Sequence, residues 1–313
     1  MKHLFIINPV AKRIKGNTKK LRGYIDAFFR QYPDVQYDIY VSEWCRDAVI
    51  CIGRYIADAR SGGSDETIRI HSMGGSGTLF EVVNSVIGLP NVEVAPHPYG
   101  KQNSFVRYYG NAAAFLSLSA QVFGETRPMD VFRCGSYYGI CFGLIGLEAY
   151  ANRVGGAWVE KGLPADPSYI IAGISRLFDK NRMQKYEVVI DGVPISGDFL
   201  SVFVANVPGY GVRLRPGADA RPDDGRLDVY LIENMPPLMI LKNTPAYLYG
   251  RYAKVKDGCF RHYTAEKIKV VSDKVMYMDI DTACFYGTSA EFEIMRGAVR
   301  VVLPDNIRKL GNE

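Results

Sequence analysis

Residues 68 to 84 read Ile68-Arg69-Ile70-His71-Ser72-Met73-Gly74-Gly75-Ser76-Gly77-Thr78-Leu79-Phe80-Glu81-Val82-Val83-Asn84. A short β-branched run leads into a Gly-Gly-Ser-Gly-Thr turn, after which an amphipathic helical pattern begins. This order predicts a strand, a glycine loop and a helix N-terminus, where backbone N–H groups can meet a phosphate closely. Thr78 is the expected N-cap, and Glu81 would complete a capping box. An ordinary strand-to-helix turn has the same pattern, so the loop alone leaves phosphate binding open.

The chain around this loop alternates between strand and helix patterns. Strands are predicted at residues 3–8, 35–41, 67–72 and 92–95, and helices between them. Such alternation predicts a doubly wound, mostly parallel sheet, in which ligands bind at the carboxyl ends of the strands. Three glycine- or proline-containing loops fall at that edge, at residues 8–16, 73–78 and 96–103. We therefore expect one crevice formed by all three loops.

The first of these loops and the helix after it carry six basic residues between Lys12 and Arg22. They would face bound phosphates if they lie at the crevice. Taken alone, they are more simply explained as a solvated helix face.

From about residue 128 the pattern changes to many short strands with turn residues between them. These predicted strands are residues 129–133, 138–144, 186–190, 199–206, 227–232, 267–271, 275–280, 290–294 and 298–302. Three helical interruptions are expected, at residues 148–158, 167–177 and 237–248. The pattern predicts an antiparallel β-sandwich. The expected domains are residues 1–124 and 125–302, with the tail 303–313 packing back onto the first.

Bulk composition narrows the function classes. The 313 residues are 48% apolar and 23% charged, which suits a sizeable core, and the net charge is +5. That mild excess fits an anionic substrate or an acidic membrane surface and is too small to indicate nucleic acid. The six cysteines form no CxxC pair and the four histidines are scattered, so neither a zinc site nor a histidine-based triad has local support. With no signal-peptide pattern and no apolar run of spanning length, we expect a cytoplasmic protein.

Several segments, in order along the chain, resemble the diacylglycerol kinase catalytic-domain family, which includes bacterial lipid kinases and sphingosine kinases. Residues 74–84 are similar to the family's GGDGTxxEVVN, and residues 98–107 to its PLGTxNDFAR. The other matching segments are Asn8-Pro9 with its basic loop, Gly146-Leu147-Glu148-Ala149, and residues 206–228, which end in Asp223-Asp224-Gly225-Arg226-Leu227-Asp228. The resemblance implies an NAD kinase- and phosphofructokinase-like α/β domain that binds nucleotide, followed by a β-sandwich domain that binds lipid.

The resemblance also implies site residues. Those expected to line the ATP crevice are Asn8, Gly74, Gly75, Ser76, Gly77, Thr78, Glu81, Lys101 and Asn103. Asp224 would ligate a structural Mg²⁺, together with the backbone carbonyls of Arg221 and Arg226. Asp279 aligns with the aspartate that takes the proton of the lipid hydroxyl, and Asp281 with the glutamate of the same DGE motif. The alternative for this pair is two exposed acids at a β-turn or strand edge.

Three positions depart from the family pattern. Ser76 replaces the aspartate of GGDGT, Ser104 replaces the aspartate of the NDF triplet, and Lys101 replaces a neutral threonine. Both serine replacements remove a carboxylate from the expected Mg·ATP position, and Mg²⁺ prefers carboxylate and phosphate oxygens. If all three side chains face the crevice, it is more positive than the family pattern by about three charges. We therefore expect nucleotide binding that depends less on Mg²⁺ than in relatives.

The leading functional hypothesis is an ATP-dependent lipid kinase that phosphorylates a hydroxyl of diacylglycerol or a related lipid. The alternative is a degenerate relative that binds nucleotide or lipid without turnover. An NAD kinase shares the glycine loop, but Asn103, Phe105 and Arg107 fit the lipid-kinase pattern better. An interaction module without phosphoryl chemistry fits least, because three strand-end loops converge.

The expected partners are a lipid substrate and the surface of the inner membrane face, with no nucleic acid. Peripheral membrane contact would use arginines of the second domain, which are as easily explained as solvated or paired. These arginines are Arg213, Arg215, Arg221 and Arg226. The sequence leaves the lipid and the oligomeric state open, a homodimer being one option.

Overall fold

The computed structural model describes residues 1–44, 46–100, 103–179, 184–209, 214–305 and 307. The chain divides into two compact units. Unit 1 contains residues 1–130 and 296–313, and unit 2 contains residues 131–295. Of the helices that the structure describes, none combines the length and the apolar character needed to cross a membrane.

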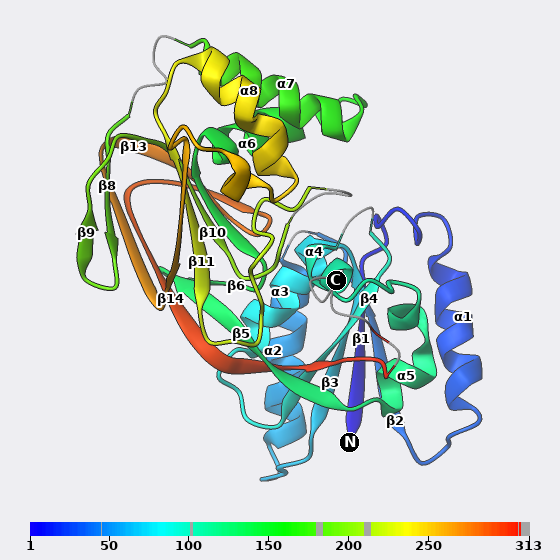
Figure 1. The fold of residues 1–313 in the computed structure, drawn as a ribbon. Helices are drawn as coiled ribbons and strands as arrows, with labels where there is room; N and C mark the ends of the chain where they lie inside the picture. The colour runs from blue at the N-terminus through cyan, green and yellow to red at the C-terminus, as the bar shows by residue number, and fades with distance from the viewer. Residues whose placement is uncertain (45, 101–102, 180–183, 210–213, 306, 308–313) are drawn as a thin grey trace. The chain divides into compact units, whose positions relative to one another are not determined.

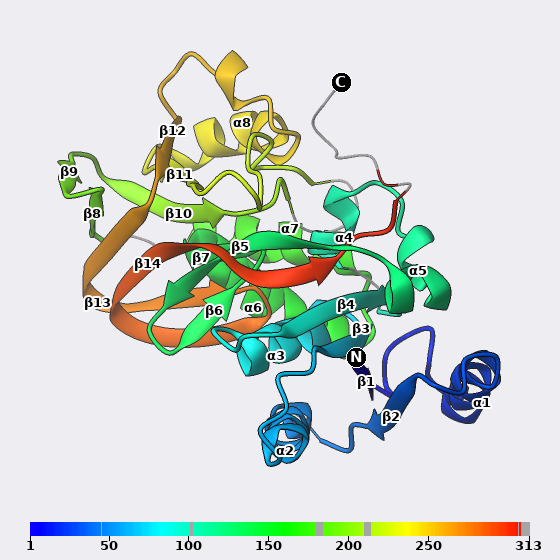
Figure 2. The same ribbon diagram turned by 90° about the horizontal axis from the view of Figure 1, so that it is seen from below.

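Unit 1 is a parallel sheet with helices on both faces (Figure 1). Its elements are β1 (Lys2–Ile7), α1 (Thr18–Phe29), β2 (Gln36–Val41), α2 (Asp47–Arg60), β3 (Ile68–Gly74), α3 (Ser76–Val86), β4 (Val92–Pro98), α4 (Ser104–Tyr108), the 3-10 helix η1 (Ala114–Leu116), α5 (Leu118–Phe123) and most of β5 (Thr126–Cys134). The sheet order is β2-β1-β3-β4, and the end of β14 (Ala283–Val302) adds to β4 in parallel, with Val301 opposite Val94. Figure 2 shows α1 and α5 on one side of this sheet and α2 and α3 on the other.

Alternation along the strands explains this layering. On β1, Phe5 and Ile7 point to the core shared with Ile25 and Phe29 of α1. Leu4, the residue before Phe5, points to the opposite face, where α2 packs. Residues 3–7 are all buried, and Lys2 at the start of the strand is partly exposed. This is expected for a parallel strand covered on both faces.

Unit 2 is largely antiparallel. Its elements are β6 (Tyr137–Gly139), β7 (Phe142–Gly146), α6 (Leu147–Glu160), α7 (Ala165–Leu177), β8 (Tyr186–Ile190), β9 (Val193–Ile195), β10 (Phe199–Ala205), β11 (Leu227–Glu233), α8 (Pro237–Leu248), the 3-10 helix η3 (Tyr252–Lys254), β12 (Phe260–Ala265), β13 (Lys267–Ile280) and most of β14. The strand order is β12-β11-β10-β7-β13-β14. β13 pairs with β8 through its first half and with β7 through its second half, with a register shift between Val271 and Met276. This shared strand gives the sandwich-like arrangement.

One core of unit 2 lies between the sheet and the helices. Leu144 of β7 and Phe203 of β10 pack with Ile240 and Tyr247 of α8. The carboxylate of Glu148, at the start of α6, accepts hydrogen bonds from Tyr247 at 2.8 Å and from Ser201 at 3.1 Å. The buried acid therefore links α6, α8 and β10.

The expected fold class is confirmed: a parallel α/β unit precedes an antiparallel, sandwich-like unit. The compact units divide at 130/131 and 295/296, whereas the pattern expectation divided the chain at 124/125 and 302/303. The difference has a pairing cause, because β5 pairs with β14 and the end of β14 pairs with β4. Leu303, the first residue of the expected tail, is buried and donates its N–H to the carbonyl of Glu125.

Candidate functional site

Three loops meet at the carboxyl ends of β1, β3 and β4, as the sequence predicted. The N–H of Asn8 donates to the carbonyl of Met73 at 3.0 Å, which joins the first loop to the second. The N–H of Gly100 donates to the carbonyl of Gly74, also at 3.0 Å, which joins the third to the second. Arg13 in turn donates its N–H to the carbonyl of Tyr99 at 3.0 Å. Backbone bonds therefore hold the three loops as one edge.

Asn8 and Thr78 fix the glycine loop from within. The Asn8 side chain donates to the hydroxyl of Thr78 at 3.1 Å, and its oxygen accepts from the N–H of Val10 at 3.1 Å. Thr78 is buried over Gly74, where an added Cβ would lie 2.1 Å from the Thr78 hydroxyl oxygen. Gly74 is therefore required by close packing, and the loop backbone is held rigidly.

Helix α3 starts two residues earlier than its expected cap. The N-cap is Gly75 and the first helical residue is Ser76, so the prediction of a Thr78–Glu81 capping box is wrong. Thr78 instead packs into the loop, and the Glu81 carboxylate accepts from the N–H of Arg46 at 3.2 Å. With no side-chain cap at Gly75, the first turn of α3 presents backbone N–H groups and the positive end of the helix dipole at the loop.

The third loop carries Asn103 as the N-cap of α4, where its side chain accepts from the N–H of Val106 at 3.0 Å. Both Asn103 and Ser104 are buried. Lys101, predicted to add a positive charge here, lies outside the described residues. The structure therefore brings Asn8, Gly74–Thr78 and Gly100 together within unit 1, and Asn103 begins the helix that follows this loop.

The six basic residues of the first loop and α1 are exposed. Exposure is what a solvated face requires, and it also leaves these side chains accessible to anions. None of the six can replace the missing loop carboxylates as a ligand of Mg²⁺, because a cationic side chain repels the ion.

A chain of three buried histidines lies beneath this edge. His3 Nδ1 and His71 Nε2 are 3.0 Å apart, and so are His71 Nδ1 and His97 Nε2. Burial lowers the pKa of His3 to about 4 and that of His97 to about 3, and burial together with the other imidazoles lowers that of His71. The sequence interpretation treated the histidines as scattered. Parallel pairing of β1, β3 and β4 aligns positions far apart in the chain, and no local pattern indicates this.

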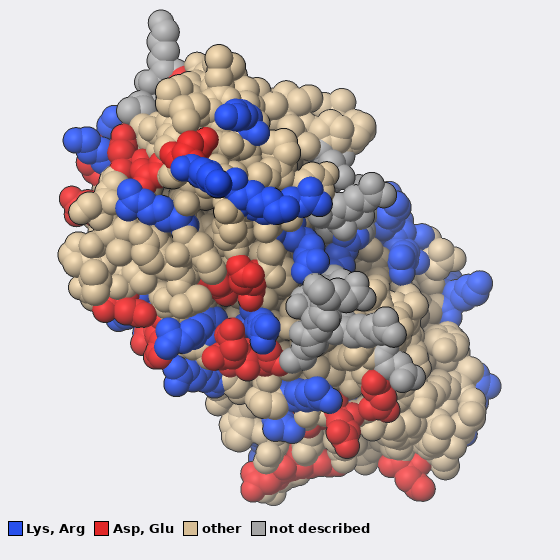
Figure 3. All heavy atoms as spheres, in the orientation of Figure 1, with Lys and Arg blue, Asp and Glu red and all other residues tan. Residues whose placement is uncertain are grey.

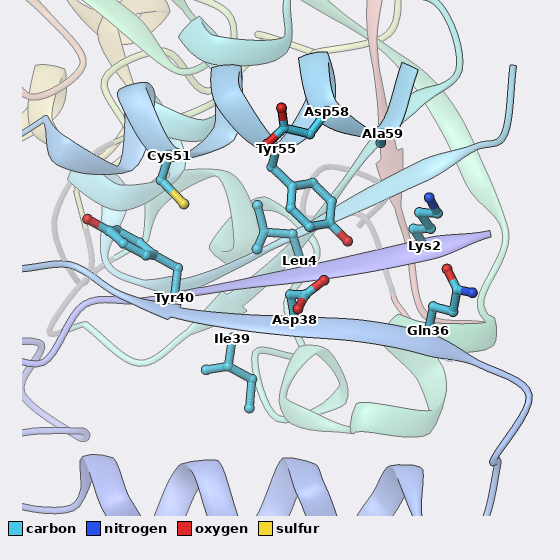
Figure 4. Close-up of a pocket in the computed structure, with 10 residues that line it drawn as sticks. All are labelled: Lys2, Leu4, Gln36, Asp38, Ile39, Tyr40, Cys51, Tyr55, Asp58 and Ala59. Atoms are coloured by element: carbon cyan, nitrogen blue, oxygen red, sulfur yellow. The ribbon is translucent and has the colours of Figure 1, made fainter. Parts of the chain in front are cut away.

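A cavity of about 490 Å³ lies elsewhere in unit 1, between α2 and the first two strands (Figure 4). Its lining residues are Lys2, Leu4, Gln36, Asp38, Ile39, Tyr40, Cys51, Tyr55, Asp58 and Ala59. None of them belongs to the three loops, so this cavity is separate from the predicted nucleotide site.

In unit 2, Asp279 is buried, with 2% of its surface exposed. The side-chain N–H of Asn152, from α6, donates to its Oδ2 at 2.8 Å, and Cys284 lies opposite it on β14. Burial raises the pKa of Asp279, while the bonds from Cys284 and Asn152 and the charge of Arg153 oppose that shift. Sequence reasoning missed Asn152 and Cys284, since only the fold brings them to the carboxylate.

Asp281, two residues on, is engaged with the backbone. Its carboxylate accepts from the N–H groups of Ile140, Cys141 and Phe142 at 2.8, 2.9 and 2.9 Å. It is 5% exposed, and burial raises its pKa to about 6 although the three bonds favour the charged form. The alternative of two exposed acids is therefore wrong, and the two carboxylates have different surroundings.

The residues expected to bind Mg²⁺ are exposed in a turn region of unit 2. Asp224 is exposed in a turn and accepts from the N–H of Arg226 at 3.1 Å, and Arg221 and Arg226 are exposed as well. Across the described part of the chain, no three or more His, Cys, Asp or Glu side chains gather to hold a metal ion. Ser76 and Ser104 supply no carboxylate at the glycine loop. The set of Asp224 and the carbonyls of Arg221 and Arg226 stays a prediction for Mg²⁺, and the proposed reaction assigns no step to the ion.

Comparisons with known proteins agree with this architecture. The family described as "Diacylglycerol kinase catalytic domain" matches residues 2–134, and that described as "YegS C-terminal NAD kinase beta sandwich-like domain" matches residues 144–303, just over half of the chain. Proteins named "Putative lipid kinase" from Staphylococcus aureus strains Mu3 and Newman are 23% identical over 240 residues, which cover 75% of this chain and 77% of theirs.

Solved structures share the fold over nearly the whole chain. The crystal structure of "a putative diacylglycerol kinase" from Bacillus anthracis strain Sterne has a TM-score of 0.71 at 20% identity, covering 98% of each chain. A second structure from that strain, described as "a diacylglycerol kinases", has a TM-score of 0.69 at 19% identity, with the same coverage. From its two family matches, the chain belongs to the diacylglycerol kinase catalytic-domain family of lipid kinases.

Proposed function

We propose that this protein is an ATP-dependent lipid kinase that phosphorylates a hydroxyl of diacylglycerol or a related lipid. The observation that carries the proposal is the edge at which backbone hydrogen bonds join the loops of Asn8, Gly74–Thr78 and Gly100. A rigid glycine loop before a helix N-terminus offers N–H groups to the phosphates of ATP without side-chain rearrangement. Family membership supports lipid as the acceptor class.

In the proposed reaction, the lipid hydroxyl oxygen attacks the γ-phosphorus of ATP while its proton passes to Asp279. A bond forms between the lipid oxygen and phosphorus, the bond to the β-phosphate bridging oxygen breaks, and ADP leaves. The raised pKa of Asp279 favours this role, because a base with a pKa closer to neutrality accepts a proton more readily. Asp281 has a supporting role in this proposal, since three backbone N–H groups occupy its carboxylate.

A second candidate function is binding of nucleotide or lipid without turnover. Ser76 and Ser104 favour it, because neither hydroxyl supplies the charge that a carboxylate gives to an Mg·ATP site. Losing one such contact costs roughly 3 kcal/mol of transition-state stabilisation, or about two orders of magnitude in rate.

The two candidates separate in an assay with radiolabelled ATP and a mixture of lipid hydroxyls. Turnover by the wild-type protein supports the kinase. Absence of turnover, with activity gained by Ser76→Asp, supports the degenerate relative. A protein that neither binds ATP nor phosphorylates any lipid contradicts both.

We further propose that nucleotide binding depends only weakly on Mg²⁺. Titration of ATP with Mg²⁺ and with a chelator should give dissociation constants within about tenfold of each other. The reason is that backbone N–H groups contact the phosphates directly, whereas carboxylates would contact them only through bound Mg²⁺. Binding that requires Mg²⁺ strictly would contradict this.

A further inference from the structure

Helix α7 in unit 2 carries an apolar face that is exposed. Ile170, Ile171, Ile174 and Phe178 are 41, 54, 36 and 59% exposed, and Leu163 in the preceding turn is 53% exposed. At 100° per residue, the four positions on and just after α7 fall within one sector of the helix. These five residues are called the α7 ridge below.

The opposite side of α7 already makes the contacts that hold it in place. Ser168 and Ala172 are buried, and α6 approaches so closely that a Cβ on Gly155 would lie 2.7 Å from the ring of Tyr169. The helix is thus apolar on both its inner and outer sides. A helix of this kind is normally buried within a larger core or in contact with lipid.

Charge is sparse along the ridge. Within α7 the sequence contains one acid, Asp166, and one base, Arg176, which pairs with Asp179 at 2.6 Å. Where α7 runs in Figure 1, the surface in Figure 3 is mostly tan. Exposed Lys161 precedes the ridge and exposed Lys185 follows it in the chain. An apolar strip with the exposed Lys161 two residues before it complements a phospholipid surface, where apolar side chains enter the acyl region and cations meet phosphates.

The size of the ridge argues against a protein partner. A stable dimer buries about 800 Å² on each side through 20–30 residues, whereas the ridge offers five side chains on one helix and its turn. A bilayer needs no complementary shape, and a few inserted apolar residues suffice for reversible binding.

We propose that the α7 ridge inserts into the surface of a phospholipid bilayer and holds the protein at its lipid substrate. The choice of partner rests on the proposed lipid-kinase function. Because insertion depends on apolar contact, binding should persist at high salt, which screens purely electrostatic adsorption. This surface is different from the arginines that the sequence suggested for membrane contact.

The full-length protein can be tested by flotation with vesicles of phosphatidylcholine and phosphatidylglycerol, without ATP, at 0.1 and 0.5 M salt. The double variant Ile171→Glu with Phe178→Glu should bind at least about 30-fold more weakly, because it loses two apolar insertions and adds charges. The matched control places the same charges at Val193→Glu and Val275→Glu, which are 60 and 62% exposed in the same unit, and should bind like wild type.

A second variant tests insertion without relying on a loss of vesicle binding. Phe178→Trp keeps the ridge apolar, and its fluorescence should be quenched by brominated lipids, whereas that of Val193→Trp should not. Any of four results would overturn the proposal: wild-type protein that fails to float, an equal loss of binding in both charge variants, binding abolished by 0.5 M salt, or an unquenched Trp at position 178. So would ultracentrifugation that shows self-association abolished by the ridge variant.

Failure of the kinase proposal gives a different result. A protein that floats through its α7 ridge but phosphorylates neither vesicle lipid nor dispersed short-chain diacylglycerol retains the membrane surface and lacks the proposed activity. If both proposals hold, the ridge double variant should lose activity on vesicles about in proportion to binding, and keep it on dispersed diacylglycerol.

Discussion

The two units use polar groups in opposite ways. At the strand ends of unit 1, backbone groups form the candidate phosphate site and no loop carboxylate is present, while three uncharged imidazoles lie buried below. In unit 2, Asp279 and Asp281 are buried acids held by side-chain and backbone donors. The site in unit 1 therefore depends on loop geometry, and the one in unit 2 on the environment of charged groups.

This difference has a consequence for pH. Burial lowers the pKa of the imidazoles in unit 1 and raises the pKa of the carboxylates in unit 2. Acidification should therefore weaken unit 1 while it relieves a penalty in unit 2. The two neighbouring acids also differ in their donors. Asp279 has one described amide donor from α6, and Asp281 has three N–H donors from the backbone.

The largest expected effect is on turnover. Asp279→Asn should lower lipid phosphorylation about 10³-fold, because it removes the proposed proton acceptor while Asn152 can still donate to the new amide oxygen. ATP affinity, measured by calorimetry, should change less than threefold. Asp273→Asn, at an exposed position on the same strand, is the control, and equal activity in both variants would remove Asp279 from the mechanism.

In unit 1, Gly74→Ala should disrupt the loop. The new Cβ would collide with the Thr78 hydroxyl, so Thr78 and the first turn of α3 must shift, with a stability loss of about 3 kcal/mol and at least tenfold weaker ATP binding. Gly53→Ala in α2, where a Cβ meets no atom within 4 Å, should be neutral or mildly stabilising. Urea denaturation and ATP titration of both variants check this, and unchanged ATP affinity in Gly74→Ala would contradict the rigid-loop interpretation.

Asp281→Asn should destabilise unit 2 by about 2–3 kcal/mol, since an amide oxygen cannot replace a carboxylate toward three N–H groups. Asn tolerates the left-handed backbone at this position, where φ is 51°. Asp191→Asn is matched, with φ of 47° and two backbone N–H donors, but it is exposed and should cost less than about 1 kcal/mol. Similar losses in urea unfolding would show that burial of Asp281 is unimportant.

Unit 1 should lose stability as the pH falls. The unfolded imidazoles have pKa values near 6.5 and the folded ones lie lower, so the unfolded state binds more protons in this window. Together the three histidines should cost about 2 kcal/mol between pH 7 and pH 6. Hydrogen exchange followed by mass spectrometry should show the faster opening in unit 1 peptides only. His262→Gln, the fourth histidine, should leave this response unchanged, and a pH-independent unit 1 would contradict the buried neutral chain.

The amino-acid sequence alone is enough to predict the fold class and the glycine-loop edge. Hydrophobic period, glycines and strand spacing act locally, so residues 68–84 predict β3, the loop and α3 without knowledge of other segments. Parallel strands also bring their carboxyl ends to one edge, which is why the convergence of the loops at Asn8, Gly74 and Gly100 could be predicted.

Contacts between side chains that are far apart in the chain are visible only in the folded protein. His3, His71 and His97 join because of strand register, Asn152 reaches Asp279 from a helix, and Asp281 binds backbone about 140 residues earlier. The Thr78 cap also failed for this reason, because Asn8 and Gly74 draw that residue into the loop. Such contacts depend on distance in space, and hydrophobic period and residue spacing along the chain carry no record of it.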